Sequence, residues 1–151
     1  MNLTVQPEIV TRPEAHYVFL ERVGPFPSVA PQAWQDVLRI APSVSEHNQI
    51  TGAMALYKMG PNVYRAGFSL SAPPQKLPQD VQYTRLVGGK YSRFVLTGAY
   101  SNLPEASGRV WSIVAEKQIQ VRDDFAVENY LSDPKTTPEE KLITEILIPT
   151  A

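Results

Sequence analysis

Residues of the same or similar type recur along this 151-residue chain at a nearly constant spacing. The matching residues are Tyr17 and Tyr91, Gly24 and Gly98, and Phe26 and Tyr100, each 74 positions apart, and the segments 57–61 and 130–134, 73 positions apart. A fixed period is typical of a structural unit that occurs more than once. The length suits one domain better than two. We therefore expect a single domain over residues 1–151, built from two similar halves, about 1–71 and 80–151.

The hydrophobic pattern predicts the same order of elements in both halves. Alternating or continuous apolar residues predict strands, and apolar residues three or four apart predict one amphipathic helix in each half. The expected strands are 3–10, 15–23, 53–59 and 63–70, then 81–87, 91–97, 125–131 and 142–148, and the expected helices are 28–41 and one that begins near 102. The Gly88-Gly89 pair predicts a hairpin between 81–87 and 91–97.

These elements predict an α+β fold. Each helix is expected to cover one face of an antiparallel sheet, so that two helices share one face and the opposite face is left for a ligand groove. Composition narrows the function that such a groove serves. The 14 Lys and Arg residues are scattered and the net charge is −1, which argues against direct binding of nucleic acid.

Other missing features exclude further classes of site. The chain has no cysteine, which excludes thiolate catalysis and thiolate metal sites. His16 and His47 lack the neighbouring carboxylates of a metal site, so we expect no bound metal. The sequence has no phosphate-binding glycine loop, so we expect no cofactor. No apolar stretch of ~20 residues and no signal peptide occur, so we expect a cytoplasmic protein without a membrane partner.

The strand expected at 125–131 carries a carboxylate next to an aromatic residue. Alternation places Glu128 on one face with Tyr130, and the helices are expected to cover the other face, which holds Phe125, Val127 and Leu131. A buried carboxylate needs a cation, a hydrogen-bond donor or a proton to offset its desolvation. Ionised, it attracts a cation, to which aromatic rings add about 1–2 kcal/mol each. Protonated, it is a general acid or base. The plain alternative is a surface glutamate on an edge strand.

The repeat shows which residues of the first half match Glu128 and its neighbour Tyr130. Glu128 and Tyr130 match Ala55 and Tyr57, so only one half carries the charge. Trp111 lies off the main stripe of its helix, and it either fills the space between helix and sheet or lines a ligand cavity. The candidate ligand-binding residues are Glu128, Tyr130, Tyr57, Ala55, Trp111, Tyr17, Phe19 and Phe68. The face of Glu145 stays open, because its strand is apolar on both sides.

Several segments together form a recognisable combination of motifs. They are 17–26 (Tyr-Val-Phe-Leu-Glu-Arg-Val-Gly-Pro-Phe), its counterpart around Gly98, 127–134 (Val-Glu-Asn-Tyr-Leu-Ser-Asp-Pro) and 144–149 (Thr-Glu-Ile-Leu-Ile-Pro). The chain resembles the GyrI-like small-molecule-binding domain over essentially its whole length. This domain is also the effector-binding module of certain AraC-type and MerR-type multidrug regulators. The resemblance implies duplicated βαββ units with pseudo-two-fold symmetry, and a central aromatic cavity whose single acid falls on Glu128.

The resemblance also implies what the cavity binds. Its ligands would be bulky, lipophilic cations, held without cofactor or metal by a stand-alone binding module that has no catalytic residue. Two alternatives stay open. Part of the family hydrolyses electrophilic cyclopropane-containing natural products, for which Glu128 and Tyr130 would be catalytic, and the family name suggests a protein-binding inhibitor of gyrase. We expect no attached DNA-binding domain, so the expected partner is a second copy in a homodimer or a separate regulator protein.

Overall fold

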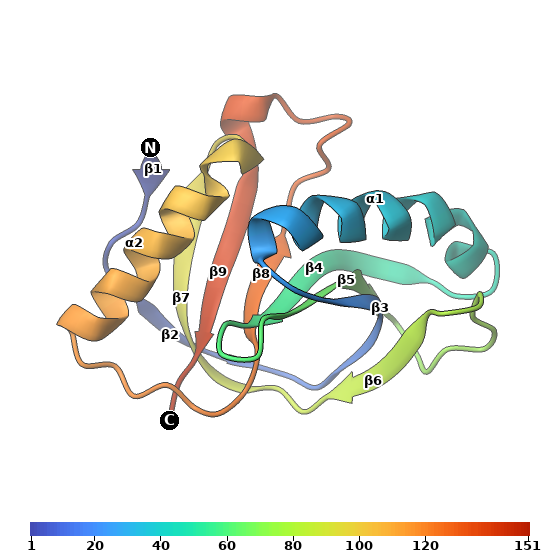
Figure 1. Cartoon of the computed structure of the whole chain (residues 1–151), viewed down its shortest axis with the longest axis horizontal. Helices are drawn as coiled ribbons and strands as arrows, with labels where there is room; N and C mark the ends of the chain where they lie inside the picture. Colours follow the sequence, from blue (N-terminus) through green and yellow to red (C-terminus); the bar gives the residue numbers. More distant parts are fainter. The chain divides into compact units, whose positions relative to one another are not determined.

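The computed structural model describes residues 1–151 and arranges them in two units. Unit 1 comprises residues 1–12 and 89–151, and unit 2 comprises residues 13–88. Each unit has one antiparallel sheet and one α-helix (Figure 1), which confirms the expected α+β class. Neither helix is both long enough and apolar enough to cross a lipid bilayer.

Unit 2 is a four-stranded sheet with helix α1 along one face. Its elements are β3 (Ala15–Val23), α1 (Phe26–Ser45), β4 (Ile50–Lys58), β5 (Val63–Leu70) and β6 (Gln82–Leu86). β5 lies between β4 and β3, and β6 pairs with the other edge of β3. Helix α1 begins after Pro25 and has proline in its first turn, where a missing N–H costs nothing.

Unit 1 repeats this arrangement with strands from both ends of the chain. Its elements are β1 (Asn2–Leu3), β2 (Glu8–Arg12), β7 (Gly89–Thr97), the 3₁₀ turn η1 (Tyr100–Asn102), α2 (Leu103–Glu116), β8 (Ala126–Tyr130), the 3₁₀ turn η2 (Glu139–Lys141) and β9 (Ile143–Pro149). β9 lies between β8 and β7, and β1 and β2 pair with the other edge of β7.

The outer strands of the two units have the same register at the spacing seen in the sequence. Glu8 of β2 pairs with Arg93, and Gln82 of β6, 74 positions after Glu8, pairs with Phe19, 74 positions before Arg93. Each outer strand leads along the chain into one unit but pairs in the other. The units therefore share one internal topology, while an origin by duplication and a two-fold axis stay predictions, as does the single domain over 1–151.

A corner after β3 in unit 2 and after β7 in unit 1 shows the same correspondence in detail. Gly24 and Gly98 have φ of 146° and 137°, which favour glycine. The Gly24 amide donates to the carbonyl of Asn62 at 3.0 Å, and the Gly98 amide donates to that of Leu142 at 2.8 Å. The repeated glycines are thus explained by a corner that ties the end of β3 to the start of β5 and the end of β7 to the start of β9.

The hairpin predicted at Gly88-Gly89 is wrong. β6 pairs with β3, whereas β7 pairs with β9 on one edge and with β1 and β2 on the other. Both edges of β7 are therefore occupied, and the two glycines connect unit 2 to unit 1 instead of turning one strand onto the next. The strand expected at 3–10 likewise forms two short strands, which pair in unit 1.

Candidate functional site

Glu128 lies on β8, half-buried, and two hydroxyl groups hold its carboxylate. The Tyr130 hydroxyl donates to Oε1 at 2.9 Å, and the Ser107 hydroxyl, on α2, donates to Oε2 at 3.3 Å. Burial raises the pKa of Glu128, and these two hydrogen bonds reduce that rise without cancelling it. The group therefore combines a costly charge with neutral donors, which is an arrangement suited to receiving a cation or a proton.

The expected position of the helix relative to this carboxylate is wrong. Glu128 pairs with Ile146 and Tyr130 pairs with Thr144 across β8 and β9, so all four share one face. Ser107 of α2 reaches Glu128, which places the carboxylate on the face that α2 covers and not on the opposite one. Alternation correctly grouped Glu128 with Tyr130, but it carries no information on which face a helix covers.

The opposite face of the same strands holds Glu145, beside the buried apolar pair Val127 and Leu147. This glutamate forms an ion pair with Arg93 and accepts a hydrogen bond of 2.8 Å from Asn129. Burial alone would raise the pKa of Glu145, but the hydrogen bonds from Arg93 and Asn129 and the charges of Arg93 and Arg12 hold it below its usual range. Glu145 is thus a compensated structural carboxylate, and its face, open from the sequence, is now assigned.

Tyr130 has a neighbour that the sequence had matched but not assigned to the site. Its ring makes an edge contact with Tyr100 of η1, with ring centres 5.4 Å apart. In unit 2 the matched residues Phe26 and Tyr57 make the same kind of contact at 5.5 Å. The aromatic pair is therefore common to both units, whereas the carboxylate beside it occurs in unit 1 and Ala55 takes its place in unit 2.

Ser107 was missed from the sequence, although the repeat contains the signal that locates it. The fully buried Ala33 and Val37 of α1 correspond to Ala106 and Val110 of α2 at the spacing of 73 that also relates Tyr57 to Tyr130. This alignment puts Ser107 where unit 2 has Trp34. The indole N–H of Trp34 donates to the Tyr64 hydroxyl at 2.8 Å, and its ring contacts Phe68 edge-on at 6.4 Å.

Thr144 corresponds to Tyr64 by the strand register, since the two residues pair with Tyr130 and Tyr57 respectively. Its hydroxyl is fully buried and has no hydrogen-bond partner. A buried polar atom without a partner costs about 1–3 kcal/mol. In unit 1, the small hydroxyl residues Ser107 and Thr144 thus replace Trp34 and Tyr64 of unit 2.

The remaining candidate residues fall on two different faces of the unit 2 sheet. Ala55, Tyr57 and Phe68 share the face that α1 covers, as the pairing register requires. Tyr17 and Phe19 alternate to the other face, where the Tyr17 hydroxyl donates to the Met54 carbonyl at 2.7 Å and the two rings stack 5.3 Å apart. The structure thus separates Tyr17 and Phe19 from the other unit 2 candidates. Trp111 lies half-buried on α2.

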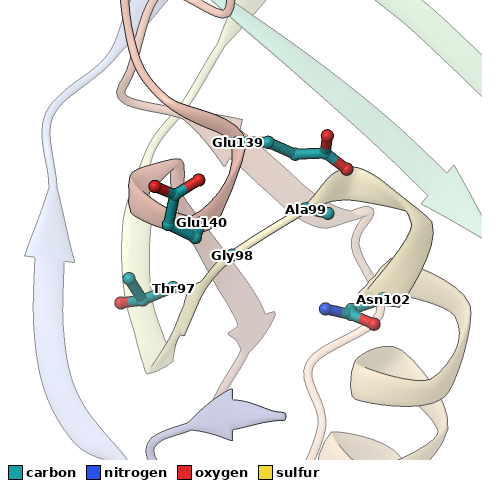
Figure 2. Close-up of a pocket in the computed structure, with 6 residues that line it drawn as sticks. All are labelled: Thr97, Gly98, Ala99, Asn102, Glu139 and Glu140. Atoms are coloured by element: carbon teal, nitrogen blue, oxygen red, sulfur yellow. The ribbon is translucent and has the colours of Figure 1, made fainter.

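An open depression of about 370 Å³ lies elsewhere in unit 1, near the end of β7 (Figure 2). It is lined by Thr97, Gly98, Ala99, Asn102, Glu139 and Glu140. None of these residues belongs to the candidate set. The chain has no group of three or more His, Asp or Glu side chains placed to hold a metal ion.

Comparison with protein families identifies the class of protein. The model of the GyrI-like small-molecule-binding domain matches residues 5–151, and the chain belongs to this family. The resemblance inferred from the motifs is thereby confirmed. No curated protein sequence matches the chain.

Solved structures show the same fold at low sequence identity. The C-terminal domain of EcmrR has a TM-score of 0.79 and 16% identity, and 97% of each chain is covered. SAV2435, solved with bound tetraphenylphosphonium, has a TM-score of 0.72 and 16% identity, with 97% of this chain and 94% of that chain covered. A hydrolase from Listeria innocua has a TM-score of 0.63 and 13% identity, with 97% and 92% covered.

Proposed function

We propose that this protein binds bulky, apolar organic cations, with Glu128 as the residue that recognises the positive charge. The observation that carries the proposal is the state of its carboxylate, which is desolvated and held by two neutral hydroxyls. A carboxylate of this kind is stabilised by any positive group that approaches it, because the charge of the guest replaces lost hydration.

A delocalised cation suits this carboxylate better than a small, hydrated one. Such a cation loses little hydration on binding, and it can lie against the rings of Tyr130 and Tyr100, where cation–π attraction adds about 1–2 kcal/mol per ring when water is excluded. Tetraphenylphosphonium, the cation bound in SAV2435, has these properties. Tyr57, Ala55, Phe68 and Trp111 stay predicted contributors to ligand binding, whereas Tyr17 and Phe19, on the other face of the unit 2 sheet, do not. A cytoplasmic location and a homodimer or regulator partner also stay predictions.

The test is calorimetric titration with tetraphenylphosphonium, together with thermal unfolding at several ligand concentrations. A ligand that binds the native state raises the unfolding midpoint by mass action. We expect Glu128→Gln to weaken binding at least about tenfold, because loss of one charge contact in a desolvated site costs more than 1.4 kcal/mol. Triphenylphosphine oxide, a neutral compound of similar bulk, should bind more weakly than the cation.

A double variant controls for the general negative charge of unit 1. Glu139→Gln with Glu140→Gln removes two carboxylates that line the open depression and leaves Glu128 unchanged. Its affinity for tetraphenylphosphonium should equal that of the wild type within about twofold. Equal affinity of wild type and Glu128→Gln would refute the proposal, and loss of binding in the double variant would move the site to the depression.

Hydrolysis is a second candidate, favoured by one feature of the same carboxylate. Glu128 has a raised pKa and a tyrosine hydroxyl 2.9 Å from Oε1, which is a suitable arrangement for general acid–base chemistry on a strained electrophile. Incubation with a cyclopropane-containing electrophile, followed by mass spectrometry, tests it. If the protein is a hydrolase, the product should carry one added water, and Glu128→Gln should form no product. A substrate that stays unchanged with the wild-type protein would reject this candidate.

A further inference from the structure

The carboxylate of Glu128 has donors that favour its ionised form only weakly. A hydroxyl can donate to a carboxylate and also to the carbonyl oxygen of a protonated acid, so neither Ser107 nor Tyr130 fixes the charge state as an arginine would. Glu145, which pairs with Asn129 next to Glu128 on β8, shows the contrast, because Arg93 holds it ionised. Protonation of Glu128 is thus left to burial and to whatever occupies the site.

No cationic side chain of unit 1 offsets the charge of Glu128. The titratable groups that face it are Tyr130, which donates to it, and Tyr100, which contacts the Tyr130 ring and whose own pKa is raised by burial and by the charge of Asp133. The exposed charged residues of α2 are engaged elsewhere or face solvent: Arg109 pairs with Glu116, and Glu105 lies in the first turn. Arg93 and Glu145 lie on the other face of the sheet.

We propose that a permanent organic cation exchanges for a proton at Glu128, and that the hydroxyl of Ser107 sets the pH at which this exchange occurs. The inference rests on the proposed function and adds its regulation. A bound cation stabilises the ionised carboxylate, whereas burial favours the protonated form in the empty site. Binding therefore expels one proton from the carboxyl oxygen to solvent, over the pH range in which the empty site is protonated.

Thermodynamic linkage gives this exchange a measurable signature. Affinity for a permanent cation should fall by up to about tenfold per pH unit below the pKa of the empty site, and should be constant above it. A neutral ligand of similar bulk has no such requirement. The pH dependence therefore discriminates between permanent cations and neutral compounds, with cations favoured as the pH rises.

Ser107 is the positioning residue in this scheme because of where it lies and how small it is. It occupies the position of Trp34, so α2 brings a hydroxyl to the carboxylate where α1 brings an indole to the sheet. Its hydrogen bond favours the ionised form and opposes the effect of burial. Removal of this donor should therefore leave Glu128 protonated to a higher pH, while the cation still meets the same carboxylate once it ionises.

The experiment measures tetraphenylphosphonium affinity by calorimetry from pH 4.5 to 9, in two buffers with different ionisation enthalpies. The wild type should release protons on binding at the low end of this range, and none at the plateau. Ser107→Ala should shift the midpoint of the pH profile upward, whatever its effect on the plateau affinity. Ser107→Thr retains a hydroxyl and should restore the midpoint, and Ser112→Ala, an exposed serine on the same helix, should not move it.

A second measurement reports on the empty site without any ligand. The carboxyl-carbon chemical shift of Glu128, followed by NMR during a pH titration, should give a higher midpoint in Ser107→Ala than in the wild type. Thermal unfolding of each variant confirms that it is folded. The inference is overturned if the two midpoints agree, or if wild-type affinity is independent of pH with no proton released.

These outcomes separate the inference from the function on which it rests. Binding that is lost in Glu128→Gln but is independent of pH would overturn the proton exchange and leave the cation-binding function intact. Absence of tetraphenylphosphonium binding at every pH would overturn both. A change in plateau affinity without a change in midpoint would make Ser107 an ordinary ligand contact and reject its role in setting the pH.

Discussion

The two units have the same backbone topology, but different side chains lie between the helix and the sheet in each. Unit 2 has Trp34, Ala55, Tyr57 and Tyr64, and unit 1 has Ser107, Glu128, Tyr130 and Thr144 at the matching positions. Aromatic side chains bury roughly 150–250 Å² each, so the set in unit 2 favours stability. The set in unit 1 contains a desolvated carboxylate and an unpartnered hydroxyl, both of which cost stability.

This difference separates the backbone topology that the two units share from the side chains of the proposed site, which occur in unit 1. The paired registers and the glycine corners are the same, so the backbone does not require the polar set. Costly groups that persist under one helix while apolar groups occupy the matching positions are typical of a functional site. The comparison between units therefore supports a role for Glu128 more strongly than its burial alone.

The largest expected effect tests how strictly the shared register constrains each unit. Gly67 of β5 corresponds to Leu147 of β9, yet a Cβ at Gly67 would lie 2.1 Å from the Val18 carbonyl oxygen and 2.8 Å from Phe19 Cβ. Backbone must move to relieve this overlap, so Gly67→Ala should lose at least about 3 kcal/mol of unfolding free energy in a urea titration. Gly60→Ala, where a Cβ meets no atom within 4 Å, should stay within about 0.5 kcal/mol; equal losses would show that the clash is not the cause.

The next effect tests the division between packing and function. Trp34→Ala removes an indole from the face under α1 and should lower the unfolding free energy by about 2–4 kcal/mol, given its partial exposure. Ser107→Ala, at the matching position under α2, should cost less than about 1 kcal/mol in the same urea titration. A loss of similar size in both variants would contradict the assignment of Ser107 to the site instead of the core.

Neutralising the two glutamates on opposite faces of the unit 1 sheet should change the free energy of unfolding in opposite directions. Glu145→Gln weakens charge-assisted bonds from Arg93 and should destabilise the protein by about 1–3 kcal/mol at neutral pH. Because the folded pKa of Glu145 is lowered, its contribution is present above the unfolded pKa and is lost as the pH falls through the folded value. The effect of the substitution should therefore shrink in acid.

Glu128→Gln should instead stabilise the protein at neutral pH. Its folded pKa is raised, so its contribution to stability is fully present below the unfolded pKa, near 4.5, and is lost as the pH rises through the folded value. Thermal unfolding from pH 3 to 8 measures both variants. A stability loss at pH 7 in Glu128→Gln, in parallel with Glu145→Gln, would mean that Glu128 is a structural carboxylate like Glu145.

The smallest effect tests the unpartnered hydroxyl of Thr144. Thr144→Val keeps the shape of the side chain and replaces the hydroxyl by a methyl group, so the unfolding free energy should rise by about 1 kcal/mol. Thr11→Val, at an exposed position of β2, provides a matched substitution that should change it by less than about 0.5 kcal/mol. A destabilised Thr144→Val would show that this hydroxyl has a stabilising partner.

Local sequence patterns predicted the elements closely but not the ends of one helix. Strands 15–23 and 63–70 were predicted to the residue, because their apolar segments are bounded by glycine at one end and by a proline-containing segment at the other. Helix α1 runs to Ser45 instead of ending at residue 41. Pro42 lacks an N–H but its carbonyl still accepts a bond from the Glu46 amide at 3.1 Å, so the last turn continues past it.

The candidate site was predicted in part for the same reason. Alternation paired Glu128 with Tyr130, and the repeat matched them to Ala55 and Tyr57, since both patterns lie within single segments. Ser107 was missed because a serine in a helix has no distinctive sequence pattern until its counterpart is known to be Trp34. Tyr17 and Phe19 were included as aromatic residues, without any means of knowing that Phe68 occupies the other face.

The sequence by itself determined the order of helices and strands along the chain and the residues that share a strand face, because these follow from periodicities of a few residues. The tertiary structure decided that the outer strands β2 and β6 each pair outside the half in which the sequence had placed them. Only the tertiary structure decided that α2 covers the face of Glu128, that β6 pairs with β3, and that Ser107 meets the carboxylate. These contacts depend on which arrangement of distant segments buries the most apolar area and satisfies the most hydrogen bonds. A local sequence pattern does not contain that information.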